Sequence, residues 1–374
     1  MKLSIGIVGL PNVGKSTLFN ALLKKQVADA SNYPFCTIEP NVGVVPVPDK
    51  RLPIIAKLVK TEKIVPAVVE FYDIAGLVKG AAEGQGLGNK FLSHIREVAA
   101  IAHVVRLFED SNVVHVANKV DPLDDIKTIE AELILADLAT ITKSITKHQK
   151  SKLQIKNQNE ILETFEKVKT QLNQGVCARN IPLTEDELEI IKPLNLLTLK
   201  PQIFVFNVSE SQLENYKDTE DQIVKLLNNH RVNNNIAIQP SNDFVILNAK
   251  LENDVLAFSE EEQKAYLKQF NLEDVGLNRL IKKSYEILDL ISFLTGGTLE
   301  ARAWTIKKGT LAPQAAGVIH TDFEKHFIKA DVVPYAEFVA SGGWVGAREK
   351  GKVQTVGRDY EMKDGDVVEF KVGV

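Results

Sequence analysis

The residues best suited to do chemistry lie in one short turn near the start of the chain, from Gly9 to Thr17. The turn reads Gly-Leu-Pro-Asn-Val-Gly-Lys-Ser-Thr. Its two glycines allow the backbone to close tightly, so that N–H groups point at phosphate oxygens. Lys15 would reach the terminal phosphates, and the hydroxyl of Ser16 would bind Mg²⁺. This spacing predicts a phosphate-binding loop, and therefore binding of a nucleoside phosphate.

The elements beside this turn are those that a phosphate loop needs. An apolar run, Leu3 to Val8, predicts a strand before the turn, and Leu18 to Leu23 has a helical pattern after it. The start of that helix adds the positive end of its dipole to the site. The residues expected to contact the phosphates are Asn12, Val13, Gly14, Lys15, Ser16 and Thr17.

Two further stretches offer ligands for Mg²⁺ and for the γ-phosphate. An apolar strand ends in Asp73-Ile74-Ala75-Gly76, which supplies a carboxylate for the metal and the N–H of Gly76 for the phosphate. Between the two motifs, Thr37 offers a second hydroxyl, so that the expected metal ligands are Ser16, Thr37 and Asp73. Together the three stretches have the layout of a molecular-switch NTPase.

The catalytic residues are less conventional. Ras-like enzymes have a glutamine after this Asp-x-x-Gly motif, which orients the attacking water, but this chain has Leu77. A leucine side chain neither donates nor accepts hydrogen bonds, so we expect slow intrinsic hydrolysis. Asn12 is a candidate ligand for K⁺, which would supply positive charge, and His115 is a candidate acid–base group. With Lys15, these residues form the predicted catalytic set.

Two stretches could read the base. Asn118-Lys119-Val120-Asp121 matches the guanine-reading motif of GTPases literally, whereas Asn207-Val208-Ser209-Glu210 matches it loosely. Too few residues separate Asn118 from the strand that ends near Phe108 to hold the helix that joins parallel strands. Asn207 directly follows a predicted strand, Pro201 to Phe206, and is followed by helical sequence. We therefore favour the second stretch as the base loop.

This choice changes the expected nucleotide. The carboxylate that would accept two guanine hydrogen bonds has become the longer Glu210, and the usual lysine has become Val208. Loss of a charge-assisted hydrogen bond worth ~1.5–3 kcal/mol would remove most of the preference for guanine, so we expect ATP to bind better than GTP. Asn248 and Ala249 would complete the base side. The alternative is an Obg-type GTPase that reads guanine through Asp121.

The composition is that of an ordinary globular protein, with 44% hydrophobic and 25% charged residues in 374. The net charge of −4 argues against a DNA partner held by nonspecific charge, while it allows local basic patches. Cys36 and Cys177 are the only cysteines, which fits a reducing cytosol. No run of 18 apolar residues and no leader sequence is present, so we expect a cytoplasmic protein with no membrane partner.

The pattern along the chain predicts an α/β fold, a doubly wound and mostly parallel sheet. The predicted strands are Val42 to Val47 (an edge strand because of Pro46), Val65 to Asp73, His103 to Phe108, and Phe244 to Leu247. The predicted helices are Asn89 to Ala102, Ser259 to Phe270 and Leu277 to Leu290. The expected domains are an NTPase domain (1–260) with an inserted helical coiled-coil domain (124–200), a helical connector (261–288) and a C-terminal α+β domain (289–372).

The inserted segment predicts a long helical hairpin. Its apolar residues recur at helical spacing, as in Ile161, Phe165, Val168 and Leu172, and as in Leu138, Ile141 and Ile145. A run of lysines without acidic residues between them lies there: Lys143, Lys147, Lys150, Lys152 and Lys156. The simpler interpretation of this run is a solvated face, and the alternative is contact with RNA phosphates.

These motifs together resemble the Obg-like ATPases, the YchF branch of the Obg-related translation-factor P-loop NTPases. The resemblance covers nearly the whole chain. It rests on the stretches that begin at Gly9, at Asn32 (Asn-Tyr-Pro-Phe-Cys-Thr), at Asp73 and at Gly86 (Gly-Leu-Gly-Asn-Lys-Phe-Leu), and on the base loop at Asn207. Further on, Arg302-Ala303-Trp304-Thr305 and the stretch from Ala315 to Lys325 resemble that family's TGS domain, a β-grasp module.

The resemblance implies a monomeric, slow ATPase that acts as a nucleotide-dependent switch on ribosomes, through the helical insertion and the TGS domain. It implies that Val208 contacts adenine and that His115 acts in hydrolysis. The Asn118–Asp121 match departs from the family pattern, as does Phe293-Leu294-Thr295-Gly296-Gly297 in the C-terminal domain. A scaffold for translation proteins, with a structural nucleotide, is an alternative of another class. In the C-terminal domain, Trp304 and Phe323 are expected to pack in the core rather than to stack on nucleic-acid bases.

Overall fold

The computed structural model describes residues 4–29, 41–74, 89–109, 120–150, 157–233, 244–270, 272 and 274–373. The chain forms two compact units. The first comprises Met1–Leu22, Pro40–Val42 and Phe71–Arg279, and the second comprises Leu23–Glu39, Gly43–Glu70 and Leu280–Val374. The second unit therefore joins the C-terminal residues with a segment from the first fifth of the sequence. No helix among the described residues is long and apolar enough to cross a membrane.

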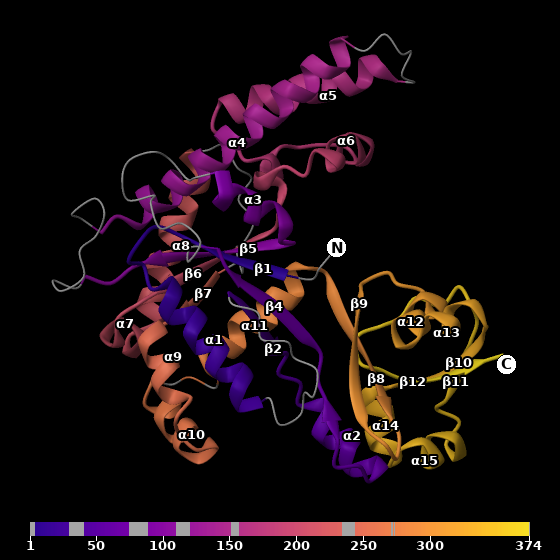
Figure 1. Cartoon of the computed structure of the whole chain (residues 1–374). Helices are drawn as coiled ribbons and strands as arrows, with labels where there is room; N and C mark the ends of the chain where they lie inside the picture. The colour runs from indigo at the N-terminus through magenta and orange to yellow at the C-terminus, as the bar shows by residue number, and fades with distance from the viewer. Residues whose placement is uncertain are drawn as a thin grey trace. The chain divides into compact units, whose positions relative to one another are not determined.

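A six-stranded sheet with the order β2-β4-β1-β5-β6-β7 organises the nucleotide domain (Figure 1). The four neighbouring strands β1, β5, β6 and β7 run parallel to one another in that order. β2 is an edge strand that ends at Pro46, as the sequence predicts, because an edge tolerates a residue without an N–H. The strands are β1 (Ser4–Val8), β2 (Val42–Pro46), β4 (Val68–Asp73), β5 (Ala100–Arg106), β6 (Gln202–Asn207) and β7 (Phe244–Leu247).

Helices follow or precede these strands along the chain, as in other doubly wound folds. They are α1 (Lys15–Asp29), α2 (Arg51–Val59), α3 (Asn89–Glu97), α7 (Glu210–Glu214), α8 (Tyr216–Asn233), α9 (Ala249–Val255), α10 (Glu260–Gln269) and α11 (Gly276–Ile287).

Three predicted boundaries are wrong. The helix predicted to run to Ala102 ends at Glu97, because the apolar residues from Ala100 onward form the wholly buried strand β5. Such continuous burial is typical of a central parallel strand, and it hides the end of the helix from sequence periodicity. The predicted strand Val65 to Asp73 is two strands, β3 (Ile64–Val65) and β4, and the predicted helix to Leu290 ends at Ile287.

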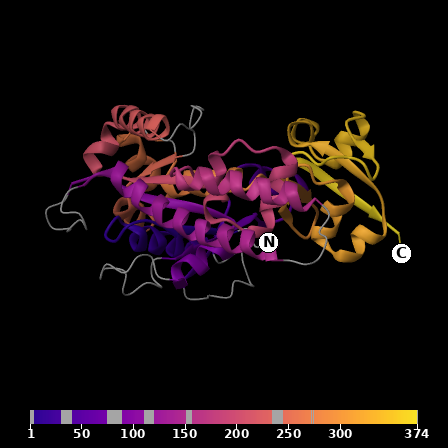
Figure 2. The same cartoon turned by 90° about the horizontal axis from the view of Figure 1, so that it is seen from above.

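The helical insertion is built as the sequence predicts. α4 (Pro122–Lys150) and α5 (Gln158–Asn173) pack together and extend away from the sheet (Figure 1), and they lie over it when viewed from above (Figure 2). α6 (Glu185–Ile191) and three short 3₁₀ turns (Ala178–Asn180, Lys192–Leu194 and Leu197–Leu199) lead the chain back to β6. The insertion has its own core, which includes Ile141, Ile145, Phe165, Val168 and Leu172.

Buried charges fix the base of the insertion. The carboxylate of Asp137, on α4, accepts hydrogen bonds from the N–H groups of Leu197 (2.7 Å) and Thr198 (2.8 Å) and from the Thr198 hydroxyl (2.7 Å). Glu130, about two turns before Asp137 on α4, forms hydrogen bonds with both Arg179 of the insertion and His230 of α8, each at 2.9 Å. The insertion is therefore anchored to the nucleotide domain through groups that would be costly to bury alone.

The second unit contains another six-stranded sheet, with the order β11-β10-β12-β8-β9-β3. β12 is parallel to β8 and antiparallel to β10, and α12 packs across one face, which is a β-grasp arrangement. Trp304 and Phe323 are partly buried against this core, as predicted. The elements are β8 (Leu290–Gly296), β9 (Ala301–Lys307), α12 (Ala312–Ile319), α13 (Thr321–Lys325), β10 (Phe327–Pro334), α14 (Tyr335–Ser341), α15 (Trp344–Glu349), β11 (Gln354–Val356) and β12 (Asp366–Val372).

The segment between β2 and β4 belongs physically to this second sheet. β3 adds an edge strand, with Ile64 opposite Ala301 in parallel register. Ile55 of α2 packs so closely on Gly296 that a Cβ added there would lie 2.7 Å from the Ile55 side chain. Arg51 bonds Asp364 at 2.7 Å. Residues separated by more than two hundred positions therefore share one core.

Candidate functional site

The phosphate loop joins β1 to α1 and is shaped by residues with positive φ. These are Gly9 (φ +149), Asn12 (φ 61) and Gly14 (φ +100). A Cβ at Gly9 would lie 2.4 Å from the carbonyl oxygen of Val104, and one at Gly14 would lie 2.2 Å from Nδ2 of Asn207. Glycine is therefore needed at both positions, for the backbone conformation and for the close approach of β5 and β6.

The side chain of Lys15 is buried within this loop, with 7% of its surface exposed. Its ammonium group donates a hydrogen bond to the carbonyl oxygen of Leu10. Burial lowers the pKa of Lys15 to about 8, although the nearby charge of Asp73 opposes this shift. A bound polyphosphate would supply the negative charge that stabilises the ammonium form.

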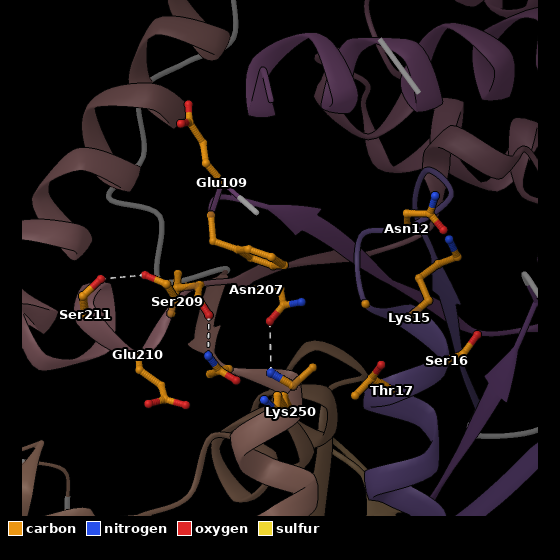
Figure 3. Close-up of a pocket in the computed structure, with 15 residues that line it drawn as sticks. Asn12, Lys15, Ser16, Thr17, Glu109, Asn207, Ser209, Glu210, Ser211 and Lys250 are labelled. Atoms are coloured by element: carbon orange, nitrogen blue, oxygen red, sulfur yellow. Dashed lines mark hydrogen bonds between the residues drawn. The ribbon is translucent and has the colours of Figure 1, made fainter. Parts of the chain in front are cut away.

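Asn207, the last residue of β6, connects the two ends of the site. Its Nδ2 donates to the carbonyl oxygen of Val13 at 2.9 Å, and its Oδ1 accepts from the N–H of Ala249 at 3.0 Å. Figure 3 shows Asn207 between the phosphate loop and the loop that follows β7. One buried amide thus sets the position of the phosphate loop relative to the base loops, with both of its polar atoms satisfied.

The two base loops are also bonded to each other. Nδ2 of Asn248 donates to the carbonyl oxygen of Val208 at 2.8 Å, and Oδ1 of Asn248 caps α9 by accepting from the N–H of Leu251 at 2.9 Å. The N–H of Val208 donates to Leu247 at 2.9 Å. Val208 is buried, with 1% of its surface exposed, so an aliphatic side chain fits there and a lysine would not.

Glu210 is the first residue of α7 and is exposed. The helix is capped by its neighbour Ser209, whose hydroxyl accepts from the N–H of Gln212 at 3.2 Å in a capping box. In Figure 3 Glu210 and Lys15 lie on opposite sides of Asn207. A carboxylate at the N-terminus of a helix is stabilised by the helix dipole and by water, and it needs no ligand there.

These loops enclose a cleft of about 840 Å³ at the carboxyl ends of β1, β5, β6 and β7. Its position is that expected of a nucleotide site in an open parallel sheet. The cleft is lined by Asn12, Gly14, Lys15, Ser16, Thr17, Phe108, Glu109, Asn207, Val208, Ser209, Glu210, Ser211, Asn248, Ala249 and Lys250.

Most of the described residues predicted for the site therefore meet in one place. Val13 does not line the cleft, but its carbonyl holds Asn207. Asp73 ends β4 and is buried close enough to Lys15 to influence its charge. Thr37, Gly76, Leu77 and His115 lie outside the described residues, as do Asn118 and Lys119.

Asp121 is used for another purpose. Its carboxylate accepts a hydrogen bond from the N–H of Asp124 at 3.1 Å, so it caps the start of α4. Asp121 is not among the described residues that line the cleft. Asp121, the last residue of the literal Asn-Lys-x-Asp match, thus lies at the N-terminus of α4, whereas Asn207 lines the cleft.

Sequence reasoning missed Phe108, Glu109 and Ser211 among the residues that line the cleft, and it included Ser209 and Lys250 only as members of the two stretches expected on the base side. Phe108 and Glu109 follow directly after β5, and the end of a central parallel strand is where a ligand is expected. The remaining three lie within the two base loops. The rule for strand ends could therefore have found them, although no motif marks them.

The fold and the site together define a P-loop nucleoside-triphosphatase with the architecture of a GTPase. Comparison with protein families agrees. Residues 4–134 match the family described as "50S ribosome-binding GTPase", and residues 290–373 match the YchF-GTPase_C family, described as "Protein of unknown function (DUF933)".

Relatives that match over their full length identify the family more specifically. It is 47% identical to the "Ribosome-binding ATPase YchF" of Bacillus subtilis and 48% identical to the protein of that name from Haemophilus influenzae, in each case over 100% of both chains. The solved Schizosaccharomyces pombe YchF GTPase is 38% identical, covers 99% of this chain and 98% of its own, and superposes with a TM-score of 0.89. The chain belongs to the YchF family.

A more distant structure shows the fold alone. A GTP-binding protein from Pyrococcus horikoshii OT3 is 20% identical, with 99% of this chain and 100% of that chain covered and a TM-score of 0.57.

Proposed function

We propose that this protein is an ATPase that hydrolyses ATP to ADP and phosphate and acts as a slow nucleotide-dependent switch on ribosomes. The observation that carries the choice of ATP is the position of Glu210. This carboxylate is exposed as the first residue of α7 and is one methylene longer than the aspartate that accepts two hydrogen bonds from guanine in GTPases, and the neighbouring Val208 is buried where GTPases have a lysine. The names of the Bacillus and Haemophilus relatives also support an ATPase that binds ribosomes.

The base would occupy the apolar end of the cleft. The half-buried Phe108 supplies apolar surface there, and the buried Val208 and Ala249 form the cleft wall beside it; the three residues come from loops directly after three different strands. A purine between such walls gains stacking and apolar contacts that do not depend on a ring-edge carboxylate. GTP would bind in the same position, but more weakly than ATP.

The phosphates would bind along the loop from Asn12 to Thr17, with the Lys15 ammonium on the terminal groups. Mg²⁺ fits the side chains present, because the Ser16 hydroxyl lines the cleft and the Asp73 carboxylate is buried near Lys15. Together with Thr37 these are hard oxygen ligands, which this ion prefers. When bound, Mg²⁺ neutralises charge on the transferred phosphate. Asn12 is a candidate ligand for K⁺. The N–H of Gly76 is a candidate donor to the γ-phosphate.

Hydrolysis should be slow because Leu77 replaces the residue that orients water in Ras-like enzymes. His115 is the proposed acid–base group. The helical insertion and the C-terminal domain are the proposed ribosomal contacts, and a cytoplasmic monomer is the proposed state. The proposals on ribosomal contacts, location and oligomeric state are supported by the resemblance to the family.

Competition between ATP and GTP for the Mg²⁺-bound protein in K⁺ buffer tests the choice of base. We expect ATP to bind at least about tenfold better, a difference of about 1.4 kcal/mol. Tighter binding of GTP would overturn the proposal. The Lys15→Ala variant should lose turnover with either nucleotide. Unchanged ribosome association by that variant, with and without ATP, would favour a scaffold over a switch.

A further inference from the structure

A buried arginine lies directly behind the base end of the cleft. Arg106, the last residue of β5, is 1% exposed and is the largest of the fully buried side chains among the described residues. A buried guanidinium is costly unless its donors are used. An aliphatic residue could occupy a core position at far lower cost. The contacts of Arg106 therefore indicate what the arginine does there.

Arg106 makes two contacts with Phe108. Its Nε donates to the carbonyl oxygen of Phe108 at 2.9 Å, which fixes the backbone two residues further along the chain. Its guanidinium carbon lies 4.5 Å from the centre of the Phe108 ring, within the range of a cation–π contact. The guanidinium therefore lies over the ring of a residue that lines the cleft.

The neighbouring residues are held by other groups. Arg106 pairs with Asn207 in the sheet register, and the N–H of Leu107 donates to the Asn207 carbonyl at 3.0 Å. Nε2 of Gln212 donates to the carbonyl of Leu107 at 3.1 Å. Leu107 is thus held by hydrogen bonds to β6 and α7. Arg106 holds the next residue, Phe108, whose ring lines the cleft.

We propose that Arg106 is a positioning residue for the base end of the site, which holds the Phe108 ring as a preformed wall against the purine. The inference rests on the proposed function only in assuming that a purine nucleotide occupies the cleft. The proposal predicts different effects on nucleotide binding and on phosphate binding. Loss of Arg106 should weaken binding that involves a base and should spare binding that involves phosphates alone, since the phosphate loop makes no use of Phe108.

The experiment compares ATP, GTP and inorganic tripolyphosphate, which has no base, by calorimetry on the full chain. We expect Arg106→Met to weaken both nucleotides about tenfold, while tripolyphosphate affinity stays within about twofold. Equal losses for nucleotide and tripolyphosphate would mean a general structural role and would overturn the proposal, as would unchanged affinity for both nucleotides.

The C-terminal domain offers a matched control. The exposed Arg358 donates to the carbonyl of Phe327 at 2.8 Å and lies 5.9 Å from that ring, so it repeats the same pair of contacts, and it is not among the described residues that line the cleft. Arg358→Met should leave all three affinities unchanged. A loss of nucleotide affinity in this control, equal to that of Arg106→Met, would contradict a local effect.

A double variant tests the route of action. If Arg106 acts through Phe108, Arg106→Met combined with Phe108→Ala should bind ATP no more weakly than Phe108→Ala alone, whereas additive losses would refute the route. If Arg106→Met does not fold, as judged by circular dichroism, Arg106→Lys replaces it, because a lysine keeps the charge without the planar group that reaches both carbonyl and ring. The same split between ATP and tripolyphosphate is then expected, and equal losses refute the proposal. A wild-type preference for GTP would refute the choice of ATP but would leave this test intact.

Discussion

The two ends of the cleft are built by different means. The phosphate end is one continuous stretch, in which backbone conformation and two glycines do most of the shaping. The base end is assembled from residues after β5, β6 and β7, which are distant in sequence and are held by side-chain hydrogen bonds. A contiguous backbone loop tolerates little change, whereas an assembled wall can exchange residues while the fold persists. This difference explains how a GTPase architecture can hold a base loop with Val208 and Glu210.

The largest expected effect comes from breaking both ends at once. Gly14→Ala would place a Cβ where Nδ2 of Asn207 lies and would strain a positive φ. We expect ATP and tripolyphosphate each to bind about a hundredfold more weakly, from about 3 kcal/mol of lost affinity. Calorimetry measures both. Gly297→Ala is the control, since nothing lies within 4 Å of a Cβ added there, and it should bind normally. Normal binding by Gly14→Ala would contradict the close contact.

Removal of the link between the ends should have the next largest effect. Asn207→Ala leaves the Val13 carbonyl and the Ala249 N–H without their partner. Each unsatisfied group costs about 1–3 kcal/mol, so we expect ATP affinity to fall at least about tenfold and tripolyphosphate affinity to fall as well. Asn248→Ala, which disturbs only the base loops, should affect ATP alone. Identical profiles for the two variants would argue against a special role for Asn207.

The pH dependence of binding sharpens the description of the phosphate end. Burial lowers the pKa of Lys15 to about 8 in the free protein, and bound phosphate should raise it. Affinity for ATP is then full below that pKa and should fall by up to about tenfold per pH unit above it, until the pKa of the complex is reached. Titrations between about pH 7 and about pH 9 measure this slope. Lys15→Arg should remove the slope, and a wild-type affinity independent of pH would contradict the assignment.

The smallest effect is expected at Glu210. Because this carboxylate is exposed at the first residue of α7, Glu210→Gln should change ATP affinity by no more than about twofold. Competition binding with ATP and GTP provides the measurement. A tenfold change in either direction would show that the carboxylate reads the base after all.

The sequence allowed the phosphate end to be predicted closely, because residues from Gly9 to Thr17 carry their own conformational requirements. The preference for Asn207 over Asn118 rests on chain length and strand order, and it stays a prediction. The structure adds that Asn207 lines the cleft and that Asp121 caps α4.

Other features depend on packing that no local pattern encodes. The true end of α3 was hidden by the apolar residues of β5, since both elements have continuous apolar sequence where they meet. Phe108 was predicted as the last residue of a strand, but β5 ends at Arg106, so Phe108 lies beyond the strand and lines the cleft. The predicted roles of Thr37, Gly76 and His115 stay predictions.

The partnership of β3 and α2 with the C-terminal sheet bears on how this protein can be dissected. A fragment that begins at Leu290, where the C-terminal family match starts, would lack the strand that pairs with β9 and the helix that packs on Gly296. Its open strand edge would invite self-association during expression. A soluble C-terminal fragment should therefore carry residues 43–70, joined to it by a linker, because the homology boundary and the folding boundary are different.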